Sequence, residues 1–255
     1  MMRRSLLLAF VSTFAVASVA IAATGGKAPK ATLVQAVGNT NAAPSLRYVM
    51  DIVVSRPEHP GVRLHVNGTR GKHELFIHVQ QMSSVLSDGT AVPGPQQSAM
   101  IDGPFLYEGS PNGIPVMGHI KWLRLPLARI GSDSKVVSTV HNFSPAPLLR
   151  LLDEWSNART RSPNGLFHGT VVYDDPIVLT ALSALTGGIE FRDVRFWARI
   201  GNDGYVHSIG VTGRTADRSR MLRVTARLYA FGRPVRLTPP AEGTFMDQKT
   251  ASLAE

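Results

Sequence analysis

Residues 189–240 constrain the fold more than any other part of the sequence, because apolar and polar side chains alternate there with a period of two. The alternation runs through residues 189–200, 205–213 and 221–231. Turn-forming residues, Gly201-Asn202-Asp203-Gly204, separate the first two runs. A period of two with one apolar side is typical of antiparallel strands that pack on one face only. The sequence therefore predicts a sheet with one buried face.

The first 22 residues have the pattern of a secretory signal peptide. Arg3 and Arg4 precede an apolar stretch, and Ala20-Ile21-Ala22 places small residues at the −3 and −1 positions of a cleavage site. We expect export and cleavage after Ala22. An uncleaved anchor is the alternative, because the apolar stretch approaches the length that spans a bilayer.

The remainder has the composition of one globular domain, with 44% hydrophobic and 18% charged residues. The chain contains no cysteine, which excludes disulfides and a lipid-anchored cysteine after the signal. The expected organisation is a signal peptide at 1–22, a linker with a short helix at 23–45, one folded domain at 46–247 and a flexible tail at 248–255.

Further strands are expected after Pro44, beginning with an alternation in which Tyr48 and Ile52 share the apolar face. Residues 62–69 and 72–80 form a hairpin whose apolar sides match if Val66 lies opposite Leu75. Shorter strands are expected at 98–102, 105–108, 119–125 and 165–173. Residues 81–97 and 131–139 are predicted to be polar loops.

Two helices are expected between these strands. Ser144 and Pro145 begin the first, and Leu148, Leu152 and Trp155 belong to its apolar stripe. Asp175 and Pro176 begin the second, which ends at Gly187-Gly188. Each stripe is either ordinary core or the wall of an apolar cavity, and periodicity does not separate the two.

Candidate catalytic and metal-binding residues are sparse. His65, Glu74 and His78 lie on the polar side of the first hairpin, but a solvated polar face explains them better than a metal site. No sequence motif of a nucleophile elbow, a zinc protease or a phosphate-binding loop is present. We therefore expect no catalysis, no metal and no cofactor, with a hydrolase assembled from distant residues as the least favoured alternative.

The formal net charge is +9, so an anionic partner is considered. Four arginines of the alternating runs face away from the apolar side: Arg195, Arg199, Arg223 and Arg227. In an exported protein this charge favours an anionic membrane surface or envelope component over nucleic acid. A basic surface that only interacts with solvent is the alternative.

The order of these elements resembles the LppX/LprAFG family of envelope lipoproteins, which is related in fold to the LolA/LolB lipoprotein carriers. The matching segments are Leu222–Pro240, the Asp203-Gly204 turn and the helix Pro145–Trp155, within a similarity that covers Ala31–Asp247. The sequence departs from the family in lacking the lipidated cysteine. The resemblance implies an α+β fold, a curved antiparallel half-barrel with helices over its concave face and a cavity for acyl chains.

The expected function is an extracytoplasmic carrier or binding protein for a lipid or other apolar ligand, non-catalytic, in the bacterial cell envelope. The residues expected to line its cavity are Leu148, Leu152, Trp155, Leu179, Leu182, Val194, Phe196, Leu222 and Val224. The alternative is an interaction or regulatory module whose interior is filled by its own side chains, with an envelope protein as partner.

Overall fold

The structure is a computed structural model that describes residues 29–55, 61–72, 74–85, 91–109, 120–131, 134–161, 165–171 and 191–247. The expected signal peptide, the second helix and the tail at 248–255 lie outside these residues. The helices are α1 (Pro29–Ala42), α2 (Leu127–Ile130), α3 (Lys135–Asn142) and α4 (Ala146–Arg150), and the π-helical turn η1 (Leu151–Trp155) follows α4.

The described residues also form twelve strands in one sheet. The strands are β1 (Leu46–Ser55), β2 (Val62–Arg70), β3 (Glu74–Val85), β4 (Ala91–Asp102), β5 (Phe105–Gly109), β6 (Trp122–Pro126), β7 (Ser156–Arg161), β8 (Leu166–Val171), β9 (Arg192–Ile200), β10 (Val206–Arg214), β11 (Met221–Tyr229) and β12 (Phe245–Asp247). Their spatial order is β12-β6-β5-β4-β3-β2-β1-β11-β10-β9-β8-β7.

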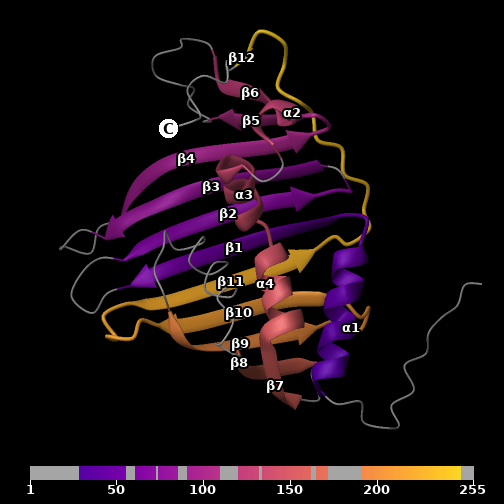
Figure 1. The fold of residues 1–255 in the computed structure, drawn as a ribbon, viewed down its shortest axis with the longest axis vertical. Coiled ribbons are helices and arrows are strands. Elements are labelled where there is room, and N and C mark those ends of the chain that lie inside the picture. The colour runs from indigo at the N-terminus through magenta and orange to yellow at the C-terminus, as the bar shows by residue number, and fades with distance from the viewer. Residues whose placement is uncertain are drawn as a thin grey trace, which may run out of the picture.

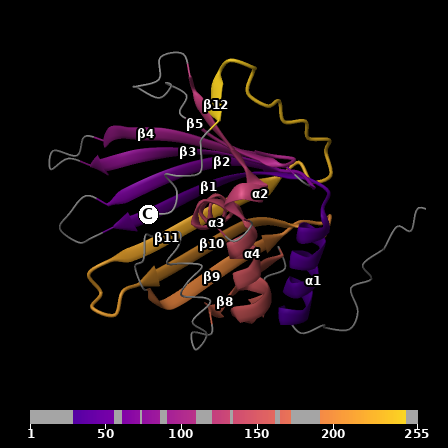
Figure 2. The same cartoon turned by 45° about the horizontal axis from the view of Figure 1, so that its top comes forward.

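The sheet is antiparallel except where the short β12 joins β6 in parallel. It is open, since β12 and β7 form its two edges. Figure 2 shows that it curves around the helices, which all lie on its concave side. This confirms the expected α+β half-barrel. The central strand β1 joins the two halves, pairing with β2 on one side and β11 on the other.

The core lies between the helices and the concave face (Figure 1). From the helices it receives Leu33 and Val37 of α1 and Leu148 and Leu149 of α4. From β1 it receives every second residue, Leu46 to Ile52, each at most 1% exposed. No helix in the described part of the chain is long and apolar enough to cross a membrane.

The predicted register of the β2–β3 hairpin is wrong. Val66 lies opposite Val79, not Leu75, and Arg70 lies opposite Leu75. The loop is longer than two residues, because the Gly71 N–H donates to the Glu74 carbonyl at 2.8 Å. The partner is displaced by an even number of residues, so every side chain keeps its face and apolar matching does not detect the difference.

The two predicted polar loops are also wrong where the structure describes them. Strand β3 extends to Val85 and β4 begins at Ala91, with register irregularities beside Met82, which lies opposite Pro93. These irregularities accommodate a proline that cannot donate to the ladder. In the second segment, Ser134 caps α3 by accepting from the Val137 N–H at 3.2 Å.

Candidate functional site: the helix-covered face of the sheet

Six of the nine residues expected to line a cavity are described with their side chains, and all six belong to one continuous apolar cluster. They are Leu148 of α4, Leu152 of η1, Val194 and Phe196 of β9, and Leu222 and Val224 of β11. Each is 3% exposed or less. The side chain of Trp155, together with Leu179 and Leu182, lies outside what the structure describes.

The strand register places these residues side by side. Phe196 is opposite Val211, and Val211 is opposite Val224 on its other side. Val224 in turn is opposite Ile52 of the central strand. A continuous apolar row therefore crosses four neighbouring strands beneath the helices.

Glycines allow aromatic rings to lie flat on this face. A Cβ on Gly169, opposite Phe196, would lie 2.5 Å from the Phe196 ring. A Cβ on Gly68, opposite Tyr48, would lie 2.0 Å from the Tyr48 ring. Any larger residue at either position would displace the ring, so the shape of the inner face depends on both glycines.

Two ionisable side chains share a second row of the inner face. The row runs from Tyr48 through Gly68, Ile77 and Ala99 to Glu108. The Tyr48 hydroxyl is buried and has no hydrogen-bond partner among the residues that the structure describes, and burial raises its pKa far above the ordinary value. Burial also raises the pKa of Glu108. The inner face therefore carries hydrogen-bonding groups in an otherwise apolar surface.

Helix α1 is held at both ends by basic side chains. Lys30 donates from Nζ to the Leu152 carbonyl and to Ser156 Oγ, both at 3.1 Å, and to the Asp153 carbonyl. Burial lowers the pKa of Lys30, and the Asp153 charge opposes this effect. At the other end, Arg70 Nη2 donates to the Thr40 carbonyl at 2.9 Å. These bonds satisfy carbonyls at two helix ends, which have no partner inside their own helix.

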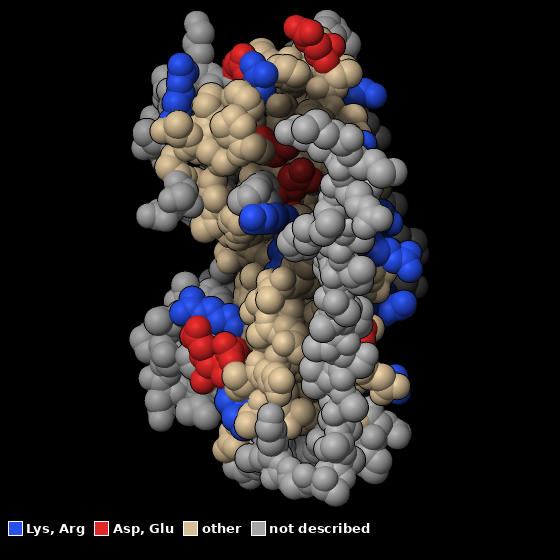
Figure 3. Space-filling model, turned by 90° about the vertical axis from the view of Figure 1, so that its right-hand side faces the viewer, with Lys and Arg blue, Asp and Glu red and all other residues tan. Residues whose placement is uncertain are grey.

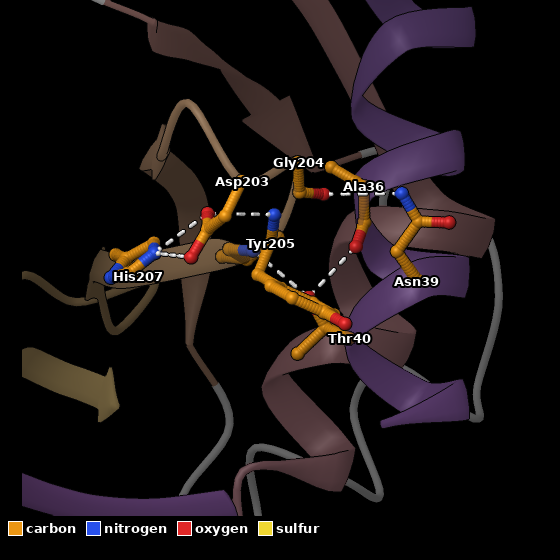
Figure 4. Close-up of polar contacts among 8 residues, drawn as sticks. Ala36, Asn39, Thr40, Asp203, Gly204, Tyr205 and His207 are labelled. Carbon is orange, nitrogen blue, oxygen red and sulfur yellow. Dashed lines mark hydrogen bonds and ion pairs between the residues drawn. The ribbon is translucent and has the colours of Figure 1, made fainter. Parts of the chain in front are cut away.

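A third anchor joins α1 to the β9–β10 turn (Figure 4). Thr40 Oγ1 donates to the Ala36 carbonyl at 2.7 Å and accepts from the Val206 N–H at 2.9 Å. Asn39 Nδ2 donates to the Gly204 carbonyl at 3.3 Å. Thr40 is fully buried, so this bond fixes the helix against the sheet from inside the core.

The same turn is braced on its outer side. His207 Nε2 lies 2.9 Å from both carboxylate oxygens of Asp203. The Phe231 ring stacks on the Tyr205 ring with 4.5 Å between the ring centroids. It packs edge-to-face with the His207 ring, with 5.1 Å between the centroids. We attribute a structural role to this cluster, because each of its contacts stabilises the turn that receives α1.

The four predicted arginines lie on the convex face, away from the helices. Thr212 of β10 is opposite both Arg195 and Arg223, and Ser208 is opposite both Arg199 and Arg227. All four arginine side chains are exposed. Figure 3 views the molecule edge-on, and basic side chains project along the side that corresponds to the convex face.

Two hollows open on the convex side of the described structure. One, of about 350 Å³, lies between the strands and the C-terminal segment and is lined by Phe76, Met100, Trp122, Arg236, Leu237, Thr238 and Pro240. The other, of about 410 Å³, is lined by Asp193, Arg195, Thr212, Gly213, Arg214 and Met221. Of these lining residues, only Arg195 was singled out from the sequence.

The three candidate metal ligands are not brought together. His65 Nδ1 lies 3.0 Å from Asp51 Oδ1, and His78 Nδ1 lies 2.8 Å from Ser98 Oγ. Glu74 lies opposite Asp102 at the other end of β3. Among the described residues, no group of three or more His, Asp or Glu is placed to hold a metal ion.

Sequence reasoning missed Lys30, Thr40, Tyr48 and Arg70 as determinants of this site. The signals were weak for the three polar anchors, because each bonds to backbone atoms far away in the sequence. Tyr48 was recognised only as a member of an apolar stripe. Its hydroxyl within that stripe was the signal that could have singled it out.

No family model and no curated protein matches the chain. Among solved structures it is similar to LprF from Mycobacterium bovis, with 13% identity, a TM-score of 0.44 and coverage of 84% of this chain and 97% of LprF. It is also similar to a LolA superfamily protein from Nitrosomonas europaea, with 10% identity, a TM-score of 0.27 and coverage of 83% and 96%. A third similar structure is a DUF1329 family protein from Desulfovibrio piger, with 10% identity, a TM-score of 0.28 and coverage of 82% of this chain and 95% of that protein. At these identities the similarity concerns the fold alone.

Proposed function

We propose that the chain is a non-catalytic binding or carrier protein for a lipid or other apolar ligand, which it holds between the concave face and the helices. The observation that supports this most is the continuous apolar row across β9, β10, β11 and β1 beneath α4. A curved sheet spanned by straight helices provides a large facing apolar surface. Helix α1, held by Lys30, Thr40 and Arg70, forms one wall.

The variant Phe196→Trp tests this proposal. If a ligand space adjoins Phe196, the larger indole fills it, so binding of a fluorescent fatty acyl probe is lost while thermal stability stays near that of the parent protein. If the interior is packed, the same change overpacks the core and lowers the unfolding free energy by about 1–3 kcal/mol.

Phe167→Trp is the matched control, because Phe167 is fully buried on β8 but was not among the expected lining residues. We expect it to destabilise the protein without selectively removing probe binding. A parent protein that binds no acyl probe, together with a destabilised Phe196→Trp variant, would contradict the carrier function.

The second candidate is an interaction module with a filled interior. The near-complete burial of the six described lining residues favours it. A well-packed parent protein that excludes the acyl probe would be the result expected for this module.

The proposal extends to the place of action and to the convex face. We infer that the protein acts outside the cytoplasm, either released by cleavage after Ala22 or held by an uncleaved signal. N-terminal sequencing of exported protein checks the cleavage. Arg195, Arg199, Arg223 and Arg227 then contact an anionic envelope surface, and each charge contributes about 1 kcal/mol near such a surface. Flotation with anionic vesicles at rising salt concentration checks this contact.

A further inference from the structure

An irregularity in strand β9 creates the more polar of the two hollows. Arg195 is opposite Thr212, whereas Arg192 is opposite Arg214, so β9 has one more residue than β10 over this interval. Asp193, within the interval, has a positive φ of 50°. Bulges of this kind bend a strand and redirect its side chains, and they are frequent beside functional sites. Here the bulge adjoins a hollow of about 410 Å³.

Arginines outnumber the one carboxylate at this hollow, that of Asp193, which forms no ion pair with them among the described residues. Arg195 and Arg214 line it, and Arg223 lies directly across from its Thr212. Arg192 and Arg214 are opposite each other on neighbouring strands, and such like-charge pairs destabilise a sheet. Among the described residues, none of these four arginines forms an ion pair. A bound anion would relieve the repulsion.

The other lining groups indicate what accompanies the anion. Thr212 contributes a hydroxyl and Asp193 a carboxylate, which accepts hydrogen bonds from hydroxyl groups and repels a second anionic group. At about 410 Å³, the hollow has room for a ligand larger than a bare phosphate. Guanidinium groups bind phosphate with paired, charge-assisted hydrogen bonds.

We propose that this hollow is a binding site for a phosphorylated polyol such as a phosphoglycerol group. The phosphate lies between Arg195 and Arg214, and the polyol hydroxyls face Asp193 and Thr212. This site is separate from the apolar face beneath the helices, and it is a more specific claim than contact between the convex face and an anionic surface. The group could belong to a lipid headgroup or to a soluble or polymeric phosphoglycerol.

The test uses soluble glycerol phosphate and inorganic phosphate, each titrated calorimetrically into the full chain. The parent protein should bind glycerol phosphate more tightly than inorganic phosphate. Arg195→Gln with Arg214→Gln should weaken glycerol phosphate binding at least about tenfold, because charge-assisted hydrogen bonds are about twice as strong as neutral ones. The comparison pair, Arg199→Gln with Arg227→Gln, removes the same charge from the same face outside the hollow. It should change this affinity less than about threefold at moderate salt.

Binding to vesicles distinguishes a phosphoglycerol group in a lipid headgroup from one in a soluble or polymeric molecule. Flotation with phosphatidylglycerol-containing vesicles, compared with pure phosphatidylcholine, shows whether the hollow binds the group in a membrane. Selective loss of either soluble or vesicle binding in the Arg195/Arg214 variant supports the site. Equal losses of soluble glycerol phosphate binding in both variant pairs would indicate diffuse surface charge and overturn it, as would binding of neither soluble probe by the parent. Equal affinity for the two soluble probes would overturn the polyol assignment.

Thermal unfolding guards against a folding artefact. The double variant Arg195→Gln with Arg214→Gln removes one partner of the Arg192–Arg214 pair, so its unfolding temperature should equal or exceed that of the parent. If the double variant is unfolded, Arg195→Gln alone replaces it, because this change leaves the Arg192–Arg214 pair intact, and unchanged glycerol phosphate binding by that variant would overturn the site. The acyl-probe test of the apolar face involves none of these arginines, so each claim can fail without the other.

Discussion

The hydroxyl of Tyr48 is the clearest energetic anomaly at the scale of single residues. It is buried without a partner in the described part of the chain, while the ring is packed over Gly68. An unsatisfied buried polar group costs about 1–3 kcal/mol. Tyr48→Phe removes that cost and keeps the ring, so we expect the unfolding free energy in urea to rise by about 1 kcal/mol or more.

Tyr107→Phe is the control for this change, since the Tyr107 hydroxyl interacts with Arg124 on the convex face. Its removal should leave stability unchanged or lower it by up to about 1 kcal/mol. If Tyr48→Phe were as destabilising as Tyr107→Phe, the Tyr48 hydroxyl would have a partner in solution. A ligand that hydrogen-bonds to Tyr48 would bind the Tyr48→Phe variant more weakly while that variant unfolds at a higher urea concentration.

At the scale of elements, the buried Thr40 side chain fixes α1 against the sheet in addition to the apolar residues of that helix. Thr40→Val keeps the shape of the side chain but leaves the Val206 N–H without an acceptor inside the core. We expect a loss of about 1–3 kcal/mol in unfolding free energy. Amide hydrogen exchange should also show faster opening of α1 and of the start of β10.

Asn39→Ala is the matched change one residue earlier. Its bond to the Gly204 carbonyl is exposed, so its loss should cost about 0.5–1 kcal/mol at most. Similar losses in the two variants would show that the buried bond has no special weight. Unchanged exchange in α1 of the Thr40→Val variant would show that the helix is held mainly by Lys30 and Arg70.

The elements also show where sequence reasoning succeeds. Strands β9, β10 and β11 were predicted within a few residues, because alternation and turn-forming residues agree there. The register of β2 and β3 was not, because an even displacement preserves the faces. Helix α3 was missed because its core contacts come from Val137 and Val140, and β-branched residues are weak indicators of a helix.

At the scale of the whole molecule, the residue pattern predicted an antiparallel sheet with one buried face, and the family resemblance predicted its curvature and the helices on its concave side. The sequence did not predict the hollows of the convex face or the detailed shape of the inner face. The hollow at Arg195 and Arg214 adjoins a bulge, and the shape of the inner face depends on Gly68 and Gly169 lying beneath aromatic rings. Such features arise from pairings across strands, and the period of a single strand does not distinguish between partners or registers that keep the same side chains on the same face.

The position of β1 has a consequence for how the protein is made. Its first residues pair with the end of β11, so Arg47 meets Tyr229 across about 180 residues of intervening chain. A nascent chain emerges with its central strand first and must leave one side of that strand unpaired until almost all of the domain has been synthesised. Pairing at such separation is slow, and an unpaired strand edge is prone to association with other chains. If the chain is exported unfolded, the sheet is completed only after β11, the last long strand, has crossed the membrane and can pair with β1.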